Sequence, residues 1–114
     1  MTLDNRPFDS LKIGDQAEYR RLVTADDLYV FAAATGNHNP MNLPDQDLDG
    51  DGRRESRAPA TFVAAMVATV LGNRLPGPGT TYRSQRLAFR GVAHVGDELV
   101  ARATVTGLAA GVVV

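Results

Sequence analysis

The feature that constrains this chain most is an apolar segment, Pro59–Gly72, which reads ATFVAAMVATVLG after the proline. Proline is well suited to the first position of a helix, because its missing N–H has no partner to lose there. A helix that is apolar almost all round is stable in water only when every side is covered. The rest of the chain therefore has to wrap this helix.

The segments after the helix are typical of strands joined by turns. Leu75–Gly79 is a tight turn, Thr80–Phe89 alternates between apolar and polar residues, and Leu99–Val105 has the composition of a second strand. Gly107–Gly111 turns again, and Val112–Val114 begins a third strand. Consecutive strands without intervening helices indicate an antiparallel sheet. We therefore predict an α+β domain in which this sheet wraps a central buried helix.

The first part of the chain predicts one strand and one helix. Gln16–Val23 alternates loosely, as a half-buried strand does. Thr24 is a good N-cap for a helix over Ala25–Thr35, and Asp27 stands at the capping-box position. Gly36 should end this helix. One face of the helix carries Leu28, Phe31 and Ala32.

Length and composition favour a single domain over residues 1–114. The chain has no cysteine, which excludes disulfides, thiolate zinc sites and cysteine nucleophiles. From the polar first residues and the short apolar runs, we expect neither a signal peptide nor a membrane-spanning segment. We expect a cytoplasmic protein. The net charge of −1 argues against a nucleic-acid partner. We interpret the local arginine groups as a mixed, solvated face: Arg20, Arg21, Arg53, Arg54, Arg57, Arg83, Arg86 and Arg90.

A long stretch of turn-forming residues, 37–58, separates the two helices and predicts a loop. Its acidic run matches the start of an EF-hand calcium loop at Asp45, Asp47, Asp49 and Gly50. The twelfth position, which should be glutamate, is Ser56, or Ala58 if the register moves by two. The entering helix is also missing. We therefore expect a mobile acidic loop, without a metal site.

Two passages resemble a known family. Residues 35–42, TGNHNPMN, are similar to the signature Gly-Asp-x-Asn-Pro-x-His, and residues 71–89, LGNRLPGPGTTYRSQRLAF, are similar to a passage in which Leu-Pro-Gly-x-Gly precedes Tyr-x-x-Gln-x-Leu-x-Phe. The turn at residues 95–97 also falls where that family has one. From roughly Gly14 to Val105, the chain resembles the MaoC-like, (R)-specific enoyl-CoA hydratases.

The resemblance implies a hot-dog fold, a homodimer or a pair with another hot-dog subunit, and acyl-CoA or enoyl-CoA as the ligand. It implies no metal and no cofactor. The family hydrates trans-2-enoyl-CoA to the (R)-3-hydroxy product. An aspartate and a histidine hold and activate a water that adds to C3, while C2 is protonated. A backbone N–H at the start of the buried helix binds the thioester oxygen.

The family's catalytic positions carry different residues here. The aspartate falls on Asn37 and the histidine on Asn42, while the oxyanion-binding glycine falls on Ala60, which follows Pro59 instead of histidine. An asparagine amide donates and accepts hydrogen bonds, but it cannot act as a base at neutral pH. The resemblance also places three retained residues at the site: Gly36, Asn39 and Pro40.

Two functions stay open. The first is an acyl-CoA-binding domain whose hydration activity is weak or absent. The alternative is an active hydratase, a lyase, that uses substitute groups such as His38 or a carboxylate of the acidic loop, and the retained Leu-Pro-Gly passage favours it. We expect the second histidine, His94, to be solvated in a turn.

The family's domain continues for one or two strands beyond the segment that matches Val112–Val114. We therefore expect the hot-dog fold of this chain to lack its last strand or strands. An apolar segment at that place would leave an unpaired sheet edge, unless a partner completes the sheet.

Overall fold

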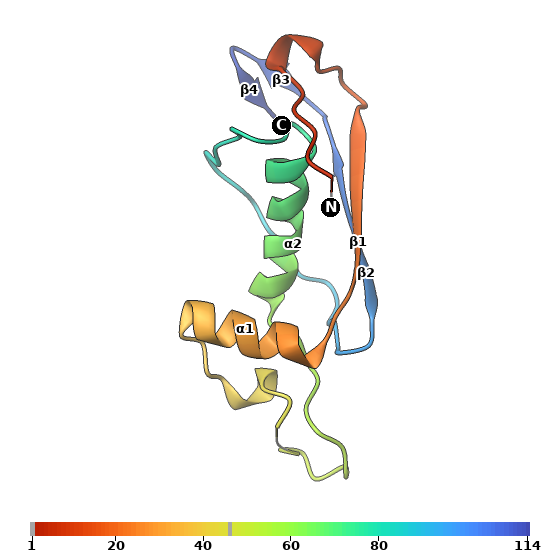
Figure 1. Ribbon diagram of the computed structural model, residues 1–114, viewed down its shortest axis with the longest axis vertical. Coiled ribbons are helices and arrows are strands. Elements are labelled where there is room, and N and C mark those ends of the chain that lie inside the picture. The colour runs from red at the N-terminus through yellow and green to blue at the C-terminus, as the bar shows by residue number, and fades with distance from the viewer. Residues whose placement is uncertain (1, 46) are drawn as a thin grey trace. The chain divides into compact units, whose positions relative to one another are not determined.

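The computed structural model describes residues 2–45 and 47–114. In chain order its elements are η1 (Phe8–Ser10), β1 (Gln16–Leu22), α1 (Ala25–Thr35), η2 (Pro40–Asn42), α2 (Ala60–Asn73), β2 (Glu98–Thr104), β3 (Leu108–Ala109) and β4 (Val112–Val113). Figure 1 labels the α-helices and the strands among them. The chain divides into two compact units. The first contains the stretches up to Arg20, Ala64–Leu87 and Val100–Val114, and the second contains Arg21–Val63 and Ala88–Leu99.

Helix α1 begins and ends where the sequence predicts. Thr24 Oγ1 accepts a hydrogen bond from the Asp27 N–H at 3.2 Å, and the Thr24 N–H donates to Asp27 Oδ2 at 2.9 Å, which completes the capping box. Gly36 ends the helix in the left-handed region, at φ 76°, where a side chain would be strained. The helix buries Leu28 and Ala32, so the predicted apolar face is confirmed.

Helix α2 begins at Ala60, directly after Pro59, whose carbonyl accepts hydrogen bonds from the N–H groups of Phe62 and Val63 in the first helical turn. It is buried along one stripe, formed by Phe62, Met66 and Val70 at i, i+4 and i+8. Val67, between these positions, is 39% exposed. Helix α2 is thus buried along one face, whereas its apolar composition predicts burial on every side. No helix in residues 2–45 and 47–114 is long and apolar enough to cross a lipid bilayer.

The turn after α2 is held by the N-terminal segment. The Asp4 N–H donates to the Asn73 carbonyl and the Arg6 N–H donates to the Pro76 carbonyl, both at 2.8 Å. Gly77 has φ 102°, and a Cβ atom built there would lie 1.8 Å from the Asp4 carbonyl oxygen. Only glycine can therefore occupy this position, which explains part of the Leu-Pro-Gly passage.

Strands β1 and β2 form a two-stranded sheet. Backbone hydrogen bonds join Asp15 to Val105 at one end of the sheet and Val23 to Asp97 at the other. The start of β1 therefore lies beside the end of β2, and the two strands are antiparallel. In the first unit, Leu11, Leu75 and Val105 form a buried cluster beside this sheet. Both predicted strands are confirmed, with bounds shifted by one residue or so.

Strands β3 and β4 form a small antiparallel hairpin, with Leu108 opposite Val113 and Ala109 opposite Val112. Positive φ angles at Ala110 (51°) and its glycine neighbour (78°) suit a two-residue hairpin turn. The predicted third strand is therefore present as Val112–Val113, and within the described residues β3 is its one partner strand, so its other edge is unpaired as expected. The tight turn lets this strand pair with the residues just before it.

The prediction of a strand over Thr80–Phe89 was wrong. Figure 1 draws this stretch without an arrow, and every residue from 81 to 92 is exposed. Within the described residues, no backbone hydrogen bond joins positions 81–92 to another segment. An alternating sequence favours an extended chain, but a strand also needs a neighbouring backbone with which to exchange hydrogen bonds. Here that neighbour is missing, and the apolar side of the segment stays open.

Candidate functional site

The start of α2 is held in place by a short antiparallel contact inside the second unit. The Ala58 N–H donates to the Ala93 carbonyl, and the Val95 N–H donates to the Ser56 carbonyl, each at 2.8 Å. Arg57 therefore pairs with His94 as an isolated β-bridge. Two segments that are far apart in the sequence, residues 56–58 and 93–95, thus meet just before the first turn of α2.

A pocket of about 650 Å³ lies at this point, and we call it the Ala60 pocket. Its volume is within the range of about 300–1,000 Å³ that small-molecule sites occupy. All of its lining residues belong to the second unit, and none of these described residues is acidic. The lining includes apolar side chains and two arginines, among them Arg57, Ala60, Val63, Phe89, Arg90 and Leu99.

The backbone N–H of Ala60 is available to a ligand in this pocket. Within residues 2–45 and 47–114, no backbone or side-chain acceptor bonds to it, and Ala60 is exposed. The first N–H groups of any helix lack partners inside the helix and carry partial positive charge. An oxygen atom that gains negative charge, such as a thioester carbonyl under attack, is the kind of group that such an N–H stabilises.

Asn42 lies close to the start of α2, whereas Asn37 lies in the exposed turn after α1. The Asn42 Nδ2 group donates to the Arg57 carbonyl at 3.0 Å, and its side chain is half-buried. Asn37 Oδ1 accepts a hydrogen bond from the Asn39 N–H at 3.2 Å, which forms an Asx turn. Neither asparagine lines the Ala60 pocket. That the two act on one ligand stays a prediction.

The other predicted site residues have clear backbone roles. Gly36 ends α1, and Asn39 caps η2 by accepting a hydrogen bond from the Met41 N–H at 3.3 Å. Pro40 is the first residue of that short helix. These three residues shape the turn that carries both asparagines, and contact with a substrate stays a prediction for them.

The two histidines lie on the surface. His38 is exposed, and the imidazole of His94 is 51% exposed in a turn, as expected. The His94 N–H donates to Asp97 Oδ2 at 2.9 Å, which closes the turn before β2. Neither residue lines the Ala60 pocket. His38 is thus not positioned there to replace a missing base.

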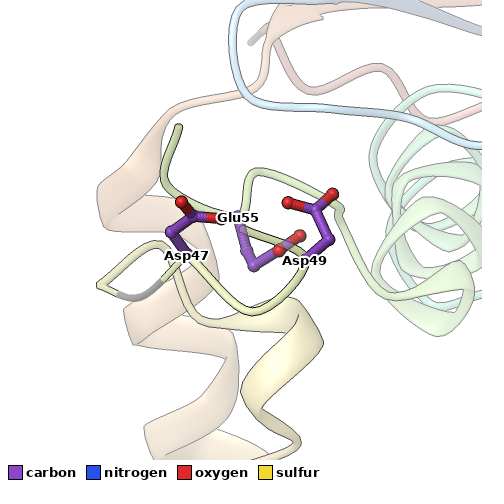
Figure 2. A group of neighbouring side chains, drawn as sticks. All are labelled: Asp47, Asp49 and Glu55. Atoms are coloured by element: carbon purple, nitrogen blue, oxygen red, sulfur yellow. The ribbon is translucent and has the colours of Figure 1, made fainter. Parts of the chain in front are cut away.

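The acidic loop is exposed, as predicted, and it is organised by its own hydrogen bonds; Gln46 lies outside the described residues. Both carboxylate oxygens of Asp47 accept backbone N–H bonds, from Gly50 and Gly52 at 2.8 Å. The side chains of Asp47, Asp49 and Glu55 each offer an oxygen, and these oxygens lie within 4.8 Å of one another (Figure 2). The arrangement resembles a cation site in donor type.

The carboxyl groups of this loop differ in proton affinity. The hydrogen bond from the Gly52 N–H lowers the pKa of Asp47 below its ordinary value of 3.8. The Asp51 N–H also favours ionised Asp49, but partial desolvation, the hydrogen bond with Asp47 and the charges of Asp51 and Glu55 together raise the pKa of Asp49 above 3.8. Because two negative charges held close together repel each other, the Asp47–Asp49 pair favours a state in which one of the two carboxyl groups keeps its proton.

Sequence reasoning did not place Arg57 and Arg90 at a pocket, since both were assigned to a solvated face. The sequence signal for them is faint: Arg57 stands three residues before Ala60, and Arg90 directly follows the alternating segment Thr80–Phe89. Only the contact between residues 56–58 and 93–95 brings them to one pocket.

Comparisons with known proteins point in one direction. No family model matches the chain. The (R)-specific enoyl-CoA hydratase of Rhodospirillum rubrum is 33% identical over 101 residues, which cover 89% of this chain and 70% of that protein. A solved R-hydratase from Pseudomonas aeruginosa in its unliganded form has a TM-score of 0.82 at 30% identity, covering 92% of this chain and 68% of its own.

A second solved structure, an (R)-hydratase from A. caviae, has a TM-score of 0.78 at 32% identity and covers 88% of this chain and 76% of its own. The paired strands, the helix α2 and the turn that follows it fit the hot-dog fold of these neighbours, so the predicted fold class is confirmed. This chain therefore belongs to the (R)-specific enoyl-CoA hydratase family and has the hot-dog fold.

Proposed function

We propose that this domain binds acyl-CoA thioesters in the Ala60 pocket and hydrates them weakly or not at all. The observation that carries the proposal is a combination. The pocket and the available Ala60 N–H are present, and the resemblance to the family assigns its acid–base pair to Asn37 and Asn42. Binding and polarisation of the thioester then survive without proton transfer.

Hydration needs a group that removes a proton from water and a group that delivers a proton to C2. Carboxylate and imidazole groups can exchange protons near neutral pH, and they typically contribute about 10²–10⁴-fold to the rate. Asn37 and Asn42 can hold a water through hydrogen bonds but cannot take its proton. The amide of Asn42 is in addition already bonded to the Arg57 carbonyl. A bound enoyl thioester would therefore meet an ordered water that is not activated.

The nature of the ligand is carried over from relatives, which are named for enoyl-CoA. Water addition and loss transfer only a proton and a hydroxyl group, so the proposal requires the thioester and no metal or other cofactor. We also propose a cytoplasmic location and pairing with a second copy or another hot-dog subunit. The exposed apolar side chains of the unpaired segment, including Leu87 at 47% and Phe89 at 53%, support a partner.

The second candidate is an active (R)-specific hydratase, a lyase that uses other groups. The specific observation that favours it is the 33% identity with a protein named for that activity. In this case a carboxylate or an imidazole from outside the Ala60 pocket would have to approach the bound enoyl group. The two functions differ in one measurable quantity, which is the rate of hydration at saturating ligand.

The experiment measures binding of crotonyl-CoA by calorimetry and its hydration by loss of the enoyl absorbance, on the same purified protein. We expect binding without appreciable hydration. The variant Ala60→Pro removes the backbone N–H at a position where proline is tolerated, and Ala60→Gly retains the N–H as the matched control. One hydrogen bond contributes about 0.5–1.5 kcal/mol, so Ala60→Pro should weaken binding about 2- to 12-fold. No measurable binding by the unmodified chain would contradict the proposal.

A further inference from the structure

Residues 81–87, which we call the open segment, present a run of backbone groups without partners. Within the described residues, no backbone hydrogen bond joins the open segment to another part of the chain, and all of its residues are exposed. The backbone neither turns nor bends between residues 80 and 90. An extended, exposed stretch with free N–H and C=O groups is a template on which another strand pairs.

The open segment is separate from the Ala60 pocket. Residues 81–87 belong to the first unit, whereas the lining of the pocket belongs to the second unit and includes none of them. A strand that pairs with the open segment therefore leaves the thioester position untouched. Binding at the open segment is thus independent of the proposed acyl binding.

The charges of the open segment restrict what pairs with it. It carries Arg83 and Arg86 and no acidic residue. Within the part of the chain that the structure describes, neither guanidinium group forms an ion pair. Tyr82 and Leu87 add exposed apolar side chains near its two ends. Opposite charges and apolar pairs across two strands are favourable, so the matching strand carries acids between apolar residues.

A second copy of the open segment does not meet this requirement. In either direction of pairing, the two copies would bring four arginines and no acid into one ribbon of two strands, and these charges repel one another. The acidic loop of a second copy does not meet it either. Gly50 and Gly52 have positive φ angles, and both carboxylate oxygens of Asp47 accept backbone N–H bonds inside the loop. That loop is therefore folded into turns and is not an extended strand.

We infer that the open segment binds an extended strand of a different protein, with two acidic residues that lie three positions apart. Arg83 and Arg86 are separated by three positions, so they fall on opposite faces of an extended chain. Directly opposite residues of paired strands share a face, and the acids of the partner strand therefore have the same separation. Backbone hydrogen bonds provide the affinity, and the two ion pairs provide the selectivity.

The test uses a synthetic peptide, acetyl-Thr-Val-Glu-Thr-Thr-Glu-Val-Thr-amide. Its sequence reads the same in both directions, so its glutamates meet the two arginines in parallel or in antiparallel pairing. One control peptide has lysine in place of both glutamates. A second control peptide has proline in place of the two central threonines, which keeps the charge and removes two N–H groups. NMR of the backbone amides reports where each peptide binds and how tightly.

We expect the glutamate peptide to bind saturably and to shift the amide signals of residues 81–87. The lysine and proline peptides should each bind about tenfold more weakly or not at all. The double variant Arg83→Glu/Arg86→Glu should prefer the lysine peptide. Arg54→Glu makes the same change at an exposed arginine of the acidic loop, so it is the matched control and should keep the original preference. Thermal unfolding checks that the variants fold.

Absence of binding by the glutamate peptide would overturn the inference. Equal binding of the glutamate and proline peptides would also overturn it, because the contact would then be charge attraction without strand pairing. The third contrary result is a dimer of the unmodified chain that Ser84→Pro dissociates in light scattering, since a second copy would then occupy the open segment. Crotonyl-CoA enters none of these measurements, so strand binding and acyl binding are tested separately.

Discussion

Restoring the acid–base pair with Asn37→Asp and Asn42→His should convert this domain into a measurable hydratase. The structure allows both changes. Asn37 Oδ1 accepts the Asn39 N–H at 3.2 Å, and an aspartate oxygen accepts the same bond. Asn42 donates to the Arg57 carbonyl at 3.0 Å, and an imidazole N–H can donate there while leaving the other ring nitrogen free as an acceptor. The loop should therefore keep its conformation.

The expected size of the gain follows from the chemistry of one shared water. General acid–base groups contribute about 10²–10⁴-fold, which corresponds to about 3–5 kcal/mol of the activation barrier. Because both groups act on one water, their contributions do not add independently. We expect a gain of about 10²–10⁴-fold for the pair and less than about tenfold for Asn37→Asp or Asn42→His alone.

The assay follows hydration of crotonyl-CoA by loss of the enoyl absorbance, at saturating ligand, with thermal unfolding as a check on folding. The two single variants are the matched controls. A third change, Ala60→Gly, added to the pair tests whether the Ala60 methyl group crowds the thioester. Robust hydration by the unmodified chain would refute the reasoning directly. A folded triple variant that binds crotonyl-CoA and stays inactive would show that the site assignment is wrong.

Four further predictions concern stability and the acidic loop. Thr24→Ala removes the capping box and should lower the free energy of unfolding by about 1 kcal/mol in chemical denaturation; an unchanged value would contradict the cap's role. Phe62→Ala removes a buried ring that packs edge-on against a second ring at 5.7 Å and should cost about 3–5 kcal/mol, whereas Val67→Ala at an exposed position should cost clearly less. NMR titration should show Asp47 losing its proton below pH 3.8 and Asp49 above it, so that near pH 3.8 Asp47 is the ionised member; the reverse order would contradict the hydrogen-bond assignment. Millimolar calcium should raise the melting temperature no more than magnesium does, because the loop lacks a twelfth-position glutamate and its carboxylates already accept backbone bonds, and a calcium-specific rise would indicate a metal site.

Several elements could be predicted from the sequence because their causes are local. A capping threonine and a helix-ending glycine define α1, since the hydrogen bonds that stabilise a helix terminus involve residues only a few positions apart. The alternation in β1 and β2 predicted two strands for the same kind of reason. The motifs around the asparagines and the Leu-Pro-Gly turn also identified the family, because sequence identity is read without any structure.

The remaining features depend on contacts between distant residues. Thr80–Phe89 alternates as β1 does, yet it forms no strand, because pairing is decided by a neighbouring backbone and not by the segment itself. The apolar composition of α2 indicated burial, but which of its faces is covered depends on what packs there. The sequence likewise showed only separate arginines and separate acids.

Tertiary structure decided which of these charged residues lie at the same pocket. Arg57 and Arg90 are 33 positions apart and share a pocket only because residues 56–58 pair with residues 93–95. The sequence by itself determined the family and the first helix, because each depends on residue identity or on neighbours along the chain. The pocket at Ala60, with Arg57 and Arg90 in its lining, was decided by the fold, because charge and shape at a site depend on residues that meet only in space.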